Sequence, residues 1–179
     1  MAKNNIKSKK GFTIIEVVLV LAIAGLIFLM VFIALPALQR SQRDTQRRDD
    51  MARFLSQLNQ YQANNNGKVP ADAAGYRSFI TNYLEAGGDT FNDPSTGKKY
   101  TVGNKDDNGS VTPCTTTDCP TSTPEDVGNI SDSDKSDRGI IHIYTNAKCD
   151  GENPVYVNGD RKIAIRIKLE GAGIYCGNN

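Results

Sequence analysis

The stretch Gly11–Leu35 reads GFTIIEVVLVLAIAGLIFLMVFIAL, and the 19 residues Val17–Leu35 within it carry no charge. A helix needs about 20 apolar residues to cross the hydrocarbon core of a bilayer, at a rise of about 1.5 Å per residue. The stretch therefore predicts a membrane-spanning helix. Glu16 is unusual, because a carboxylate costs about 2.5 kcal/mol or more in such a helix, and less near the interface. A simple membrane anchor has no use for this residue.

A short basic leader comes before the apolar stretch. Residues 1–11 contain four lysines, Lys3, Lys7, Lys9 and Lys10. The whole chain has a formal net charge of +1, and without the leader 17 basic residues face 20 acidic ones. A mildly acidic remainder argues against general nucleic-acid binding, which requires a clustered basic surface.

The residues at the junction of leader and helix form a known motif. The sequence KKGFTIIE, residues 9–16, resembles the class III signal of type IV prepilins and pseudopilins. The resemblance covers residues 9–35 and is weak beyond them. It implies that a prepilin peptidase removes residues 1–11 by cutting between Gly11 and Phe12, and that the same enzyme methylates the new N-terminal Phe12. It also implies that Glu16 is an assembly residue, which pairs with the Phe12 amine of another subunit.

The same resemblance implies an α+β fold, with a long N-terminal transmembrane and assembly helix packed against an antiparallel β-sheet head. The implied function is that of a pilin, a structural subunit that polymerises into an extracellular type IV pilus for adhesion or twitching motility. The implied partners are further copies of the chain in a helical filament, prepilin peptidase, the pilus assembly ATPase with its inner-membrane platform, and the membrane before assembly. No cofactor is expected. The precursor is expected to cross the cytoplasmic membrane once, with its head outside.

Two other functions stay open at this stage. The first alternative to a pilin is a pseudopilin of a type II secretion or DNA-uptake system. The second is a single-pass membrane-anchored extracellular binding module. A secretory signal peptide fits less well, because its apolar core spans about 7–15 residues and a small-x-small cut site follows it. An ordinary signal anchor explains the length of the apolar run but not the spacing of Gly11, Phe12 and Glu16.

Residues 12–64 are predicted to form one long helix, of which residues 12–35 are the transmembrane segment and filament core. Gly25 and Pro36 are its expected weak points, since glycine lowers helix stability and proline removes a hydrogen bond. In the family that the motif resembles, a common proline would fall at Ile33, so this chain departs from the pattern there.

The second half of the helix changes character. Residues 39–50 are polar on every side, which favours a solvated helix face with local Arg–Asp pairs over a contact with lipid headgroups. Large apolar residues then recur at helical spacing and predict the face on which a sheet packs. They are Met51, Phe54, Leu55, Leu58 and Tyr61.

Residues 65–179 are predicted to form the head. It contains a short helix near residues 73–86, a variable loop at residues 92–138 and an antiparallel sheet at residues 139–176. Val155–Val157 leads into Asn158-Gly159, a two-residue hairpin signal. Ile163–Leu169 alternates apolar and polar residues, which predicts a half-buried strand with its isoleucines inward and its charges outward.

Four cysteines lie beyond the apolar helix, Cys114, Cys119, Cys149 and Cys176. An even number in a translocated head indicates two disulfides in an oxidising compartment. Three pairings are possible. We favour Cys114–Cys119, which closes a tight local loop, and Cys149–Cys176, which ties the chain end to the sheet as in many pilins. A zinc site is the alternative, but the cysteine spacings fit no familiar zinc finger.

The sequence contains no arrangement typical of an enzyme. His142 is the only histidine and has no evident catalytic partner, and the sequence shows no nucleophile motif and no phosphate-binding loop. We therefore expect no catalytic residues and no metal site.

Overall fold

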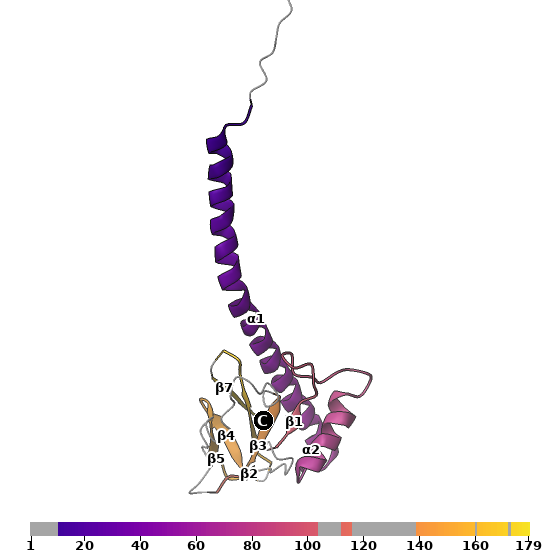
Figure 1. Ribbon diagram of the computed structural model, residues 1–179. Coiled ribbons are helices and arrows are strands. Elements are labelled where there is room, and N and C mark those ends of the chain that lie inside the picture. Colours follow the sequence, from indigo (N-terminus) through magenta and orange to yellow (C-terminus); the bar gives the residue numbers. More distant parts are fainter. Residues whose placement is uncertain (1–10, 104–111, 116–138, 160, 172) are drawn as a thin grey trace, which may run out of the picture. The chain divides into compact units, whose positions relative to one another are not determined.

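Helix α1 (Ile14–Asn64) contains the uncharged run Val17–Leu35 and continues through Gly25 and Pro36 (Figure 1). It agrees with the helix predicted at residues 12–64. The computed structural model describes residues 11–103, 112–115, 139–159, 161–171 and 173–179. The chain divides into two units, Met1–Gln39 and Arg40–Asn179, so that α1 contributes to both. We call the second unit the head.

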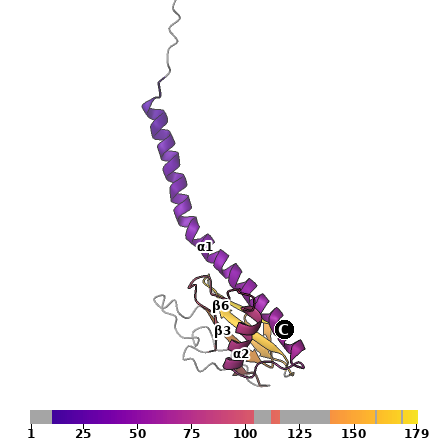
Figure 2. The same cartoon turned by 90° about the vertical axis from the view of Figure 1, so that its right-hand side faces the viewer.

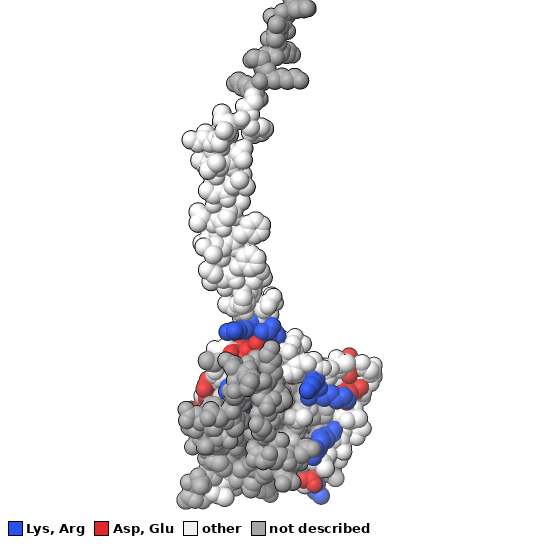
Figure 3. All heavy atoms as spheres, viewed as in Figure 1, with Lys and Arg blue, Asp and Glu red and all other residues white. Residues whose placement is uncertain are grey.

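The described part of the first unit is an apolar helix with exposed side chains. Its large hydrophobic side chains between Ile14 and Leu38 are 44–85% exposed. Among the described residues, α1 is the one helix that is long and apolar enough to cross a membrane, judged by length and composition. Figure 3 shows the uncharged surface of this segment and the charged residues of the head. Exposure of this much apolar surface requires a cover, such as lipid or another protein.

The head begins with the second half of α1 and a short helical segment. Helix α2 (Ala73–Phe79) starts after Asp72, whose side chain accepts a hydrogen bond from the Gly75 N–H at 2.7 Å. Such an N-cap satisfies one of the backbone donors that a helix leaves open at its start. The chain continues as one π-helical turn, η1 (Ile80–Leu84). Together they account for the short helix predicted near residues 73–86.

The sheet of the head is mixed rather than purely antiparallel. Its path has the order β1 (Thr101–Val102), β3 (Ile140–Thr145), β6 (Ile163–Lys168) and β7 (Ile174–Asn178). Strands β3, β6 and β7 pair antiparallel, as the sequence predicts. The short strands β1 and β2 (Thr112–Pro113) both pair with β3 in parallel. They come from the predicted variable loop at residues 92–138, much of which lies outside the described residues.

The predicted hairpin at Asn158-Gly159 is wrong. Strand β5 (Asn153–Tyr156) pairs antiparallel with β4 (Ala147–Asp150), and the two strands form a separate sheet. The turn between them passes through Gly151, which has φ = 62°, a conformation that glycine adopts without steric cost. Strand β6 pairs with β3 and β7 instead. The Asn-Gly dipeptide therefore lies in a connection between two sheets.

One face of the mixed sheet packs on α1, as the helical spacing predicts (Figure 2). Met51, Phe54 and Leu58 are fully buried, and Tyr61 packs at the edge of the same core. The Phe54 ring lies between aromatic neighbours from other elements, with its centroid 5.3 Å from that of Phe79 and 6.3 Å from that of Phe91. Burial of each such side chain contributes about 1.5–3 kcal/mol to folding.

The other face of the sheet is also covered. This corrects the prediction that the charged side chains of β6 face outward into solvent. Arg166 is only 3% exposed, and its guanidinium lies 6.0 Å from the centre of the Tyr144 ring. Ala164 beside it on β6 is fully buried. The β4–β5 hairpin contributes Ala147 and Tyr156 to this second core. The side chains that alternate along β6 therefore lie on two faces that are both buried. The second face is buried because the β4–β5 hairpin, which the sequence did not predict, covers it.

His142 lies on β3 directly opposite Arg166 of β6. Burial lowers the pKa of His142 to about 4, and the positive charge of Arg166 adds to this effect. Within the described residues, its Nε2 atom has no hydrogen-bond partner. Protonation of this side chain is therefore opposed in the folded head.

We expect acid to destabilise the head through His142. An unfolded chain protonates this histidine near pH 6.5, so it binds more protons than the folded head between about pH 6.5 and pH 4, and stability falls as the pH falls through that window. The full shift corresponds to about 3 kcal/mol. His142→Gln should flatten this part of the profile. The check is urea unfolding of both proteins in detergent micelles at pH 7 and pH 4.5, and parallel profiles would contradict the expectation.

Candidate processing and assembly site

The segment Gly11–Glu16 forms the start of α1. Gly11, Phe12 and Thr13 precede the helix, which begins at Ile14. Phe12 is 92% exposed. The peptide bond between Gly11 and Phe12 therefore lies in non-helical, accessible backbone. A protease can bind such a bond without first unwinding a helix.

Glu16 caps its own helix. Its Oε2 atom accepts hydrogen bonds from the Thr13 N–H and from the Thr13 hydroxyl, both at 2.9 Å. In return the Glu16 N–H donates to Thr13 Oγ1 at 3.4 Å. This reciprocal pattern is a capping box, in which an N-cap Thr and a Glu three residues later satisfy each other's backbone donors. The acidic side chain also lies at the end of the helix dipole that favours a negative charge.

The sequence analysis missed this role of Glu16, although its signal was present. Residues 13–16 read T-I-I-E, which matches the S/T-x-x-E pattern of a capping box. Both capping bonds come from Thr13, so a cut between Gly11 and Phe12 leaves them in place. Both also fall on Oε2. A carboxylate has about four acceptor positions, so the capped Glu16 can still accept a hydrogen bond from a second cation.

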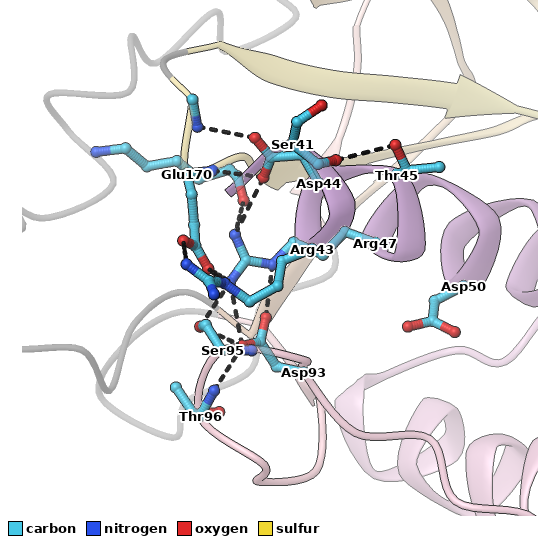
Figure 4. Close-up of polar contacts among 12 residues, drawn as sticks. Ser41, Arg43, Asp44, Thr45, Arg47, Asp50, Asp93, Ser95, Thr96 and Glu170 are labelled. Atoms are coloured by element: carbon cyan, nitrogen blue, oxygen red, sulfur yellow. Dashed lines mark hydrogen bonds and ion pairs between the residues drawn. The ribbon is translucent and has the colours of Figure 1, made fainter. Parts of the chain in front are cut away.

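A second polar site lies in the head, where Arg47 is fully buried (Figure 4). Its Nε donates to Asp93 Oδ2 at 2.7 Å and its Nη2 donates to Asp93 Oδ1 at 3.1 Å. Nη2 also lies 2.8 Å from Ser95 Oγ and 3.4 Å from Glu170 Oε1. Asp93 has no exposed surface. The pair is bidentate, which is the strongest geometry of an arginine–carboxylate contact.

Neighbouring residues of α1 extend this contact. Arg43 donates through Nε and Nη2 to the two oxygens of Glu170, at 2.8 Å and 2.7 Å. The carboxylate of Asp44 accepts from the backbone N–H groups of Glu170 and Gly171, at 2.7 Å and 2.8 Å. We call the five residues Arg43, Asp44, Arg47, Asp93 and Glu170 the polar network. It joins α1 to two distant segments, the turn at Asp93 and the turn between β6 and β7.

The polar network corrects the prediction of a solvated helix face at residues 39–50. The local pair exists, since Arg47 Nη1 lies 3.7 Å from Asp44 Oδ1, but the shorter contacts of Arg47 are to Asp93 and Glu170. Burial alone would raise the pKa of Asp93, yet hydrogen bonds from Arg47 and Ser95 outweigh it and hold this pKa below its usual value. The hydrogen bond to Glu170 raises the pKa of Arg43. Both groups are therefore ionised at neutral pH.

Three of the four cysteines lie in the described part of the head. Cys149 of β4 and Cys176 of β7 form a disulfide with a Cα–Cα distance of 5.8 Å, which is the pairing that we favoured. The backbone N–H of Cys149 also donates to the side chain of Asn178 at 3.1 Å. Cys114 is disulfide-bonded as well. Cys119 lies outside the described residues, so the Cys114–Cys119 pairing stays a prediction.

Breaking the Cys149–Cys176 bond should destabilise the head by about 2–4 kcal/mol, since it closes a loop of 27 residues. The change is Cys149→Ser with Cys176→Ser, measured by urea unfolding in detergent micelles. A non-reducing peptide map of the unchanged chain is the companion measurement. Free thiols at these two positions in that map would contradict the pairing.

Among the described residues, no group of three His, Cys, Asp or Glu side chains is arranged to bind a metal ion. Gly25 and Pro36 both lie within α1, and a Cβ placed on Gly25 would meet no atom within 4 Å. A break of the helix at either residue in an assembled filament stays a prediction.

Comparison with known proteins gives one match. The family model described as the prokaryotic N-terminal methylation motif matches residues 6–32. This range contains the Gly11–Phe12 junction, the capping box and most of the apolar stretch. No curated protein and no solved structure matches the chain.

Proposed function

Because residues 6–32 carry the class III signal of type IV pilin-like proteins, we propose that the chain is a pilin, cut before Phe12 and assembled through α1 into an extracellular filament. The observation that carries the proposal is the exposed apolar helix with Glu16 at its start. Its side chains need an apolar cover, and the bilayer supplies one before assembly. In a filament, the helices of other copies supply the apolar cover instead.

Glu16 gives this assembly its register. Cleavage creates an ammonium group at Phe12, and a neighbouring Glu16 in an apolar surrounding is its natural partner. Opposite charges attract strongly where the dielectric constant is low, although their desolvation offsets much of the gain. If the Phe12 amine does not reach a Glu16 carboxylate, both charges stay unpaired in an apolar bundle of helices. The pair therefore selects one axial position among many that bury similar apolar area.

The head completes the proposal. Charged side chains lie on its described surface, and the Cys149–Cys176 disulfide fits the oxidising surroundings of an extracellular domain. Adhesion or surface motility is the proposed role of the filament, and prepilin peptidase, an assembly ATPase and an inner-membrane platform are the proposed partners. A pseudopilin of a secretion or DNA-uptake system would share the features of residues 6–32.

The test is to shear cells that express the chain, collect extracellular filaments and determine the N-terminus of the chain in them by peptide mass analysis. The expected result is a chain that starts at N-methylated Phe12 within long filaments. A chain that is cut at Phe12 but stays with the cell envelope would favour the pseudopilin. A chain that keeps Met1, or is cut beyond Leu35, would contradict the proposal.

A further inference from the structure

The first contacts that α1 makes within the head are ionic rather than apolar. Arg47 is the first buried residue of the helix, and Met51 is its first buried apolar residue. Before Arg47, the contacts of Arg43 and Asp44 with the turn between β6 and β7 hold the helix. The polar network thus fastens the turn of α1 from Arg43 to Arg47, and the hydrophobic core takes over after it, where Asp50 accepts a hydrogen bond from the hydroxyl of the buried Tyr100 at 2.9 Å.

These contacts tie the helix to chain segments that are distant in sequence. The turn between β6 and β7 supplies Glu170, 127 residues from Arg43, and the turn before β1 supplies Asp93, 46 residues from Arg47. The Asp93 carboxylate also organises its own turn, since Oδ1 accepts from the Ser95 N–H at 2.9 Å and from the Thr96 N–H at 3.1 Å. The Asp93 carboxylate is therefore held by its own turn as well as by α1.

This arrangement opposes unwinding of α1 toward the core. A polar helical segment has little stability of its own, so its end opens readily unless tertiary contacts hold it. Opening at residues 40–42 breaks none of the network's contacts to the head. Opening past Arg47 separates its guanidinium from Asp93 and leaves that carboxylate buried without its partner, which is a costly state. The free energy of opening therefore rises steeply between Arg43 and Arg47.

We propose that the polar network stops the unwinding of α1 before this unwinding reaches the hydrophobic core. The head then stays folded on its part of α1 while the preceding apolar segment changes its surroundings or its conformation. The inference goes beyond the proposed function, because it requires only that α1 continues from the head into an apolar segment.

The test is hydrogen exchange of the full chain in detergent micelles, followed by mass spectrometry of peptides from α1. Glu170→Gln keeps the side-chain volume and the Arg47–Asp93 pair, so the head should stay folded. We expect amides of residues 44–50 to exchange about tenfold faster or more in this variant. Amides of residues 51–58, which lie on the hydrophobic core, should stay better protected than those of residues 44–50, and their rates should rise by no more than the loss of global stability that urea unfolding of the same variant gives. Arg43→Gln should give a smaller increase, confined to the start of the same segment.

Arg53→Gln is the matched control, because Arg53 lies on the same helix but pairs with the exposed Asp89 at 2.9 Å. It should leave exchange of residues 44–50 unchanged. Unchanged exchange of these residues in both Glu170→Gln and Arg43→Gln would overturn the proposal. Equal acceleration of residues 44–50 in Arg53→Gln and in Glu170→Gln would also overturn it, because the effect would then not depend on the network. Filament formation plays no part in this measurement, so its outcome is independent of the proposed function.

Discussion

Asp93→Asn is expected to destabilise the head by about 3–5 kcal/mol, because it leaves the buried Arg47 guanidinium beside a neutral amide. The amide can accept one of the two hydrogen bonds but cannot balance the charge. Glu170, at 3.4 Å from Arg47 Nη2, stays as a weaker counter-charge and places the expected loss toward the lower end of this range. The measurement is urea unfolding of the full chain in detergent micelles, monitored by circular dichroism.

A second substitution separates the charge effect from the loss of packing. Arg47→Met added to Asp93→Asn removes the unpaired cation, so the double variant should be about as stable as Asp93→Asn or more stable. Arg53→Gln should cost less than Asp93→Asn, since Asp89 is exposed and the loss of the hydrogen bond from Arg53 to the Leu84 carbonyl at 2.6 Å leaves no buried charge behind. A loss below 1 kcal/mol for Asp93→Asn would show that the network contributes little to stability.

The pH profile gives an independent check on Asp93. Its pKa in the folded head is lower than in the unfolded chain, where it lies near 3.8. The stability that this carboxylate provides is therefore fully present above about pH 4 and is lost as the pH falls through the folded pKa. This window lies below that of His142. Asp93→Asn should flatten the profile only in the lower window.

Periodicity predicted the elements that pack through one continuous apolar face. The helical spacing of Met51, Phe54 and Leu58 identified the face of α1 that covers the sheet. The alternation along Ile163–Leu169 identified β6. These patterns succeed because they depend on residues that are close together in the chain.

Two features could not be predicted, because their partners are far apart in sequence. Arg47 looked like part of a solvated face, since nothing near it in the chain points to Asp93. Arg166 looked solvent-facing, because the cover over the second sheet face comes from the β4–β5 hairpin. In both cases a tertiary contact overrides a local preference. The Asn158-Gly159 signal failed for a local reason, because β5 pairs with the preceding strand β4 through the turn at Gly151.

Glu16 shows a different limit, since the sequence contained two signals on the same residue. The resemblance gave it a role between subunits, and the T-x-x-E pattern gives it a role within its own helix. The two roles are compatible, because the capping bonds use one oxygen of the carboxylate. They make different demands on its charge, however, since glutamine also serves in a capping box.

Glu16→Leu is expected to abolish filaments or to leave very few. The variant should still insert and be cut at Gly11, because the leader and the junction are unchanged. Without the carboxylate, each incoming Phe12 ammonium would stay unpaired in an apolar bundle, at a cost of about 3–5 kcal/mol. This variant also loses the capping box, so filament loss alone does not separate the two roles of Glu16.

Two matched variants separate them. Glu16→Gln keeps the length of the side chain and its capping bonds but removes the charge. Thr13→Val removes the hydroxyl of the cap and keeps the charge of Glu16. If the charge sets the register, Glu16→Gln should behave like Glu16→Leu, whereas Thr13→Val should assemble in larger numbers than either. If the cap alone matters, Glu16→Gln should assemble in larger numbers than Thr13→Val.

The most direct measurement is therefore the number of surface filaments formed by Glu16→Gln, counted by electron microscopy. Immunoblots must first show that the variant reaches the membrane and is cut before Phe12 as efficiently as the unchanged chain. The proposed pairing of Phe12 with Glu16 predicts few or no filaments from this processed variant. Filament numbers equal to those of the unchanged chain would contradict it.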